Sequence, residues 1–90
     1  MDGTDPTAAT EARQAAVLLA AIEAMEATIS VAEALVAQGR RIDLDGLEAE
    51  VERLCAACLA APRGAAPAVR ARLEGLLRLH DRLQGALPPP

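Results

Sequence analysis

The chain has 90 residues, a formal net charge of −4 and no Phe, Tyr or Trp. This length allows one domain, and an acidic chain without stacking aromatic residues argues against nucleic acid as a partner. A chain this small buries only about 60% of its unfolded surface, so self-association is a natural source of further stability. We therefore expect an oligomer, with a homodimer as the first choice.

The first expected helix covers residues 6–38, after a disordered tail at 1–5. Asp5 can cap this helix, and Pro6 suits its first position, where the missing N–H costs nothing. Before Val17 the segment is mostly alanine and has little apolar surface to bury, so we expect it to be helical only where a neighbour covers it. Apolar residues then recur with the a and d spacing of a heptad, at Leu18, Ile22, Met25, Ile29, Ala32 and Val36.

The clearest stop and start signals follow this helix. Gly39 suits the left-handed residue that ends a helix, because it has no Cβ. Asp43 can accept hydrogen bonds from the free N–H groups of the next helix, while Ile42 packs on Leu47 as a hydrophobic staple. Asp45 is a competing cap that would move the helix start by two residues. These signals predict a helical hairpin corner.

Two shorter helices are expected, over residues 44–61 and 67–86. Each combines one apolar seam with one charged face, which is typical of amphipathic helices. Pro62 and Gly64 end the earlier helix, and Pro67 suits the first turn of the later one. The connections on both sides of the 44–61 helix are short, and short connections make consecutive helices antiparallel.

The fold class predicted from these elements is all-α, an antiparallel up-down-up three-helix bundle with a long first helix. The sequence contains no strand signal and no internal repeat. We expect the three-helix domain to cover residues 6–87, with a Pro-rich tail at 88–90.

The first helix is about twice as long as either of the others, so a hairpin packed along it covers only part of its apolar seam. The remaining seam predicts a small helical protein–protein interaction module that self-associates. The partner is expected to be a second copy of the chain or an amphipathic helix of another protein. The predicted interaction residues are Leu18, Ile22, Met25, Ile29 and Val36.

Cys55 and Cys58 have the spacing of a metal knuckle or a redox pair, and His80 is a conceivable third ligand. The two cysteines are expected near the carboxyl end of their helix, where the helix dipole opposes a thiolate, and no second Cys or His pair exists. Structural cysteines are therefore the favoured interpretation, and a thiol or metal sensor is the alternative. No nucleophile with a partnered base and no phosphate-binding loop is present, so we expect neither an enzyme nor a cofactor.

Charge divides the chain into an acidic first helix and a basic region at residues 63–82. These are either two solvated faces or surfaces that select a partner. All basic residues are arginine and alanine is abundant, which is typical of a bacterial genome rich in G and C. No uninterrupted apolar run approaches the ~20 residues that span a bilayer, and the amino terminus has no signal-peptide pattern. We therefore expect a cytoplasmic protein without membrane contact.

In its small size, acidic charge and all-helical organisation the chain resembles the flagellar export chaperones of bacteria. In that family a long helix and a shorter hairpin present an apolar groove to a client helix. The resemblance implies a client-helix binder as a further alternative.

Overall fold

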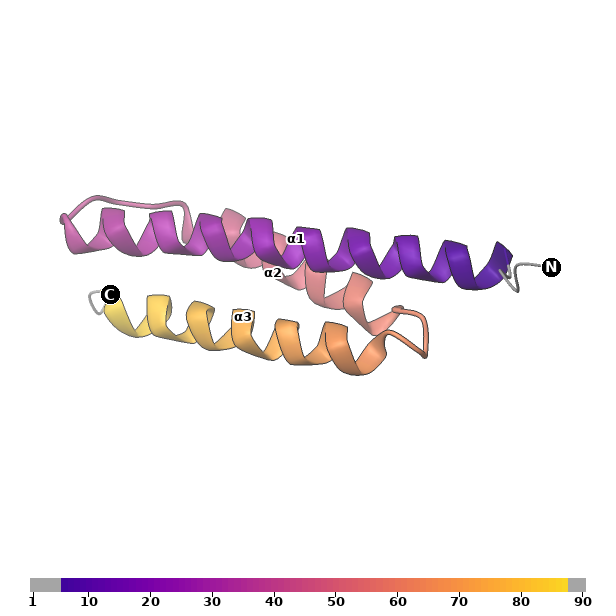
Figure 1. Ribbon diagram of the computed structural model, residues 1–90. Coiled ribbons are helices and arrows are strands. Elements are labelled where there is room, and N and C mark those ends of the chain that lie inside the picture. The colour runs from indigo at the N-terminus through magenta and orange to yellow at the C-terminus, as the bar shows by residue number, and fades with distance from the viewer. Residues whose placement is uncertain (1–5, 88–90) are drawn as a thin grey trace.

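The computed structural model describes residues 6–87, so the expected tails at 1–5 and 88–90 lie outside the described residues. It contains three helices, α1 (Pro6–Ala37), α2 (Leu44–Leu59) and α3 (Ala66–Ala86). Figure 1 shows α1 and α3 running side by side in one direction, with α2 returning in the opposite direction behind them. The predicted all-α, up-down-up bundle with a long first helix is confirmed.

The bundle is a rod of 60 × 18 × 18 Å with a radius of gyration of 16.1 Å, whereas a compact chain of this length has a radius of about 12 Å. It is elongated because α1 runs past the α2–α3 connection at its amino-terminal end (Figure 1). Residues 6–14 are exposed there, apart from a half-buried Ala9, and nevertheless helical. Alanine-rich sequence has high helix propensity, and adding turns to an established helix costs far less than nucleating one.

The core is built mainly between α1 and α3, the pair of helices in most extensive contact. Its fully buried side chains come from these two helices: Ile22, Ile29, Val69, Leu76 and Leu83. The second helix adds Leu47, Leu54 and Cys58 to the same cluster. Burying one aliphatic side chain of this kind contributes about 1.5–3 kcal/mol, so this seam dominates the stability of the bundle.

The corner between α1 and α2 follows the signals in the sequence. Gly39 has a φ of +74°, and the N–H of Arg40 donates to the carbonyl of Leu35 at 2.9 Å, which is the 6→1 hydrogen bond of a Schellman motif. Asp43 caps α2, because its Oδ1 accepts from the N–H of Gly46 at 3.0 Å. The predicted cap and the predicted start of α2 are confirmed, and Asp45 lies in the first turn instead.

The Asp43 cap and Gly46 depend on each other, since a Cβ added to Gly46 would overlap the Asp43 carboxylate. Asp43→Ala is expected to destabilise the chain by about 0.5–2 kcal/mol through the lost cap. Gly46→Ala gains helix propensity of up to about 1 kcal/mol, but displaces the cap, so it should change stability little in the wild type. In the Asp43→Ala background, the same change should stabilise the chain.

Chemical denaturation followed by far-ultraviolet circular dichroism of the two single variants and the double variant measures this coupling. Asp45→Ala is the matched control, because this carboxylate does not cap the helix. Additive effects of Asp43→Ala and Gly46→Ala would show that the cap has been misplaced.

Candidate interaction surfaces

The residues predicted to meet a partner lie in the core of the chain itself. Ile22 and Ile29 are fully buried, with 0% of their surface exposed. Leu18, Met25 and Val36 are half-buried against the same cluster. The seam is therefore filled by α2 and α3, so a second chain cannot reach Ile22 or Ile29 without opening the bundle. A heptad pattern identifies an apolar face, but it does not specify whether the same chain or another one covers it.

Ile22→Ala should destabilise the bundle by about 2–5 kcal/mol, because it opens a cavity at a fully buried position. Val31→Ala is the matched control on the same helix, since Val31 is 60% exposed, and it should change stability by less than about 0.5 kcal/mol. Guanidinium denaturation followed by circular dichroism makes the comparison. Equal midpoints for the two variants would contradict the placement of Ile22.

A different face of α1 is left uncovered. We call it the outer face of α1, and its eight residues are all exposed: Ala16, Val17, Ala20, Ala24, Ala27, Thr28, Val31 and Ala34. No charged residue is among them, and two valines, Val17 and Val31, are 67% and 60% exposed. The heptad pattern does not identify this face, because its residues lie outside the a and d positions. The available signal was that alanine, valine and threonine, and no charged residue, occupy the side of α1 opposite its seam from Ala16 to Ala34.

The apolar character of α1 also corrects the expectation that no segment approaches the length of a membrane span. By length and composition alone, α1 is long and apolar enough to cross a membrane, and little of its apolar stretch is buried in the bundle. Glu23 and Glu26 interrupt the apolar sequence of α1, so an expectation based on uninterrupted apolar runs did not include it. A core helix of a soluble protein or a signal sequence can be equally long and apolar.

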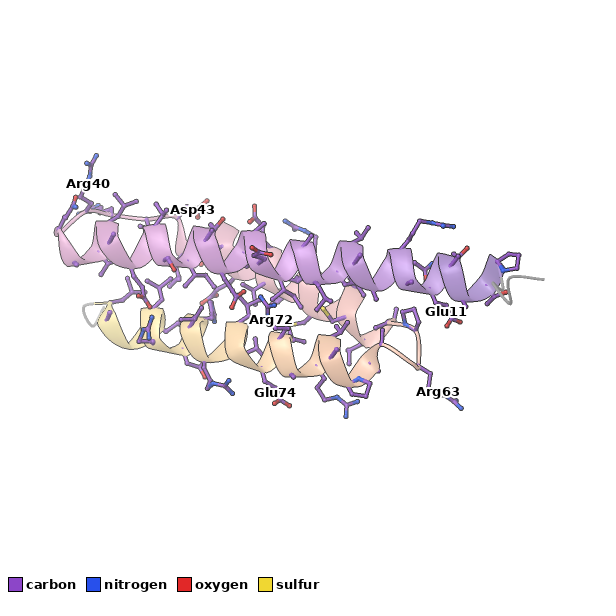
Figure 2. The ribbon with its side chains drawn as sticks, viewed as in Figure 1. Glu11, Arg40, Asp43, Arg63, Arg72 and Glu74 are labelled. Atoms are coloured by element: carbon purple, nitrogen blue, oxygen red, sulfur yellow. The ribbon has the colours of Figure 1, made fainter. Side chains whose placement is uncertain are left out.

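Two ion pairs join α1 to α3. Arg72 donates to Glu26 at 2.9 Å, and Arg82 donates to Glu33 at 2.8 and 3.2 Å. Figure 2 shows Arg72 in the space between the two helices, whereas Glu74 on the same helix points away from α1. The acidic and basic regions of the sequence therefore meet within one chain at these two places.

The Arg82 guanidinium lowers the pKa of Glu33, chiefly through its hydrogen bonds to the carboxylate and also through its charge. A carboxylate with a lowered pKa in the folded state adds stability at neutral pH. That stability is lost as the pH falls through the lowered pKa, below the ordinary value of 4.5. Since the arginine side chain is 65% exposed, salt weakens the interaction.

Arg82→Gln should lower stability at neutral pH and reduce the loss of stability on acidification below pH 4.5, the ordinary pKa of Glu33. Thermal melts across the acidic range measure both effects. Arg78→Gln is the control, because Arg78 lies on the same helix and forms no ion pair among residues 6–87. If the two variants share one pH profile, Glu33 does not gain stability from Arg82.

The cysteines and His80 do not form a metal site. Within residues 6–87, no group of three or more His, Cys, Asp or Glu side chains could hold a metal ion. Cys55 and Cys58 are both free thiols. Burial, together with the neighbouring Cys55, raises the pKa of Cys58 above its ordinary value of 9.0, so its thiol is protonated at neutral pH. This geometry offers nothing in favour of the thiol or metal sensor.

An open groove of about 560 Å³ separates α2 from α3 on the surface. We call it the α2–α3 groove, and its lining residues are Glu48, Val51, Glu52, Cys55, Ala56, Leu59, Leu77, His80 and Gln84. Leu59 is 87% exposed, and Gln84 donates to Glu48 across the groove at 2.8 Å. The Nε2 atom of His80 is buried without a hydrogen-bond partner. The periodicity of α2 did not reveal this groove, because Leu59 lies outside the seam that was recognised.

The chain matches no protein-family model, no curated protein and no solved structure.

Proposed function

We propose that this protein is a small, non-catalytic, cytoplasmic interaction module that forms a homodimer through the outer face of α1. The observation that carries the proposal is the outer face of α1, whose eight exposed residues between Ala16 and Ala34 include no charge, although the exposed Glu23 lies beside them. The side of a surface helix opposite its apolar stripe normally carries charged and polar residues, and within residues 6–87 no element covers this uncharged one.

The spacing of the two exposed valines suits a two-fold axis. If the axis passes near Ala24, Val17 of one chain meets Val31 of the other, and Ala20 meets Thr28 in the same way. Alanine at the axis allows the two backbones to approach closely, and an antiparallel pair also places opposite ends of the helix dipoles together. Most soluble oligomers have such an axis, which brings one surface patch against itself.

The size of this surface predicts a weak dimer. From Ala16 to Ala34 the face extends about 27 Å, and a helix is about 10 Å wide. Two copies therefore bury on the order of 600 Å², which is less than the roughly 1,200 Å² of a standard interface. At about 25 cal/mol per Å² this burial contributes roughly 15 kcal/mol, against an association cost of about 4–15 kcal/mol. We expect dissociation in the micromolar range.

A second candidate is insertion of α1 into a membrane, which its length and composition would allow. Two features of the bundle argue against insertion. Insertion would remove Ile22 and Ile29 from the core, and it would separate the Glu26 and Glu33 carboxylates from their arginine partners. An acidic residue at the centre of a membrane helix costs about 2.5–3.5 kcal/mol by insertion measurements.

Sedimentation equilibrium of the wild type over a micromolar concentration series should show a mass rising from 9.3 kDa to twice that value. The double variant Val17→Glu, Val31→Glu should stay at 9.3 kDa, with an unchanged circular dichroism spectrum, since both valines are exposed. Leu59→Glu is the matched control on α2, and it should dimerise as the wild type does.

A wild type that remains monomeric at high micromolar concentration would overturn the homodimer. Co-flotation of the protein with vesicles of phosphatidylcholine and phosphatidylglycerol, abolished by the same double variant, would assign the outer face of α1 to a membrane instead.

A further inference from the structure

We infer that the α2–α3 groove binds one amphipathic helix of another protein, with an apolar stripe flanked by arginine or lysine. This inference goes beyond the proposed homodimer, because the two surfaces share no residue. No residue of α1 lines the groove, so occupation of one surface leaves the other free.

The apolar part of the groove has the form that a helix requires. On α2 the wall consists of Val51, Cys55 and Leu59, four residues apart and therefore on one side of the helix. On α3 the facing residues are Leu77 and His80. Leu59 is the most exposed large apolar side chain among residues 6–87, at 87%. A docked apolar stripe would remove Leu59 from water, as in other complexes where a helix lies in a groove.

The charge of the groove indicates which residues the partner helix carries beside its apolar stripe. The charged residues that line the groove are Glu48 and Glu52, and no arginine is among the lining residues. Glu48 is hydrogen-bonded to Gln84, whereas Glu52 forms no ion pair or hydrogen bond with any residue of 6–87. A ligand helix with basic flanking residues complements this rim, and an acidic one is repelled.

The same charges argue against a second copy of this chain as the occupant. Its basic helix, α3, already buries Val69, Leu76 and Leu83 in its own bundle. The outer face of α1 offers apolar side chains but no basic residue. A helix from a different protein is therefore the partner that fits.

The groove extends along α2 from Glu48 to Leu59, which is about 17 Å at 1.5 Å per residue. Three turns of a ligand helix fill this length. Two synthetic peptides of about 16 residues therefore serve as probes, each with the same leucine stripe and one tryptophan. One peptide carries arginine beside the stripe and the other carries glutamate. Because the protein has no Trp, Tyr or Phe, the tryptophan signal reports on the peptide alone.

Fluorescence titration should show that the arginine peptide binds and that the glutamate peptide binds at least about tenfold more weakly. Leu59→Ser should weaken binding of the arginine peptide about tenfold, through loss of one buried leucine contact. Glu52→Gln should weaken it about two- to fivefold, with less sensitivity to salt. Since Leu59 and Glu52 are exposed, both variants should melt as the wild type does.

Val31→Ser is the matched control, because it removes an exposed apolar side chain from the outer face of α1 and should leave binding unchanged. Equal affinity for the two peptides, no effect of Leu59→Ser, or an equal loss in Val31→Ser would each overturn the inference. The titration is repeated with the double variant Val17→Glu, Val31→Glu, which lacks the proposed homodimer surface. Peptide binding by this variant tests the groove independently of dimerisation.

Discussion

The parallel packing of α1 against α3 is the interaction on which the rest of the structure depends. Within residues 6–87, it supplies the five fully buried large side chains and the two ion pairs, while α2 completes the core at one side. Because consecutive helices with short connections are antiparallel, two parallel helices require a third to join them. The second helix therefore serves as the connection as well as a packing element, and its contact with α3 leaves the α2–α3 groove open.

Much of the fold could be predicted from the sequence because specific residue types mark the ends of its helices. Gly39, Asp43 and Pro62 leave little choice about where helices end and begin, and the apolar seams of α2 and α3 are regular. The surfaces could be predicted less well. Ile22 and Ile29 were expected to meet a second chain, and the sequence pattern alone does not distinguish that arrangement from burial against α2 and α3. The exposed positions of Val17 and Leu59 depend on how far the short helices extend, which is a property of packing.

The absence of aromatic residues limits the apolar area that the core can bury, and alanine partly compensates for this loss. Without large rings the core consists of a narrow line of aliphatic side chains, and each adds only a modest area. Alanine allows helices to approach closely and favours the helical backbone. The same residue on the outer face of α1 produces a surface that is neither charged nor strongly apolar. Such a surface suits a partner that is released readily.

The two ion pairs also bear on how α1 and α3 align. Ile22 and Ile29 are seven residues apart, as are Leu76 and Leu83, so the apolar seams would match again if α3 slid along α1 by one heptad. The charges would match at only one place, because α1 and α3 form their ion pairs through two glutamates, Glu26 and Glu33, and two arginines, Arg72 and Arg82. A slide that brought one arginine to a glutamate would leave the other without a partner. Exposed ion pairs add little stability, but the loss of one of these two favours the observed alignment over one displaced by a heptad.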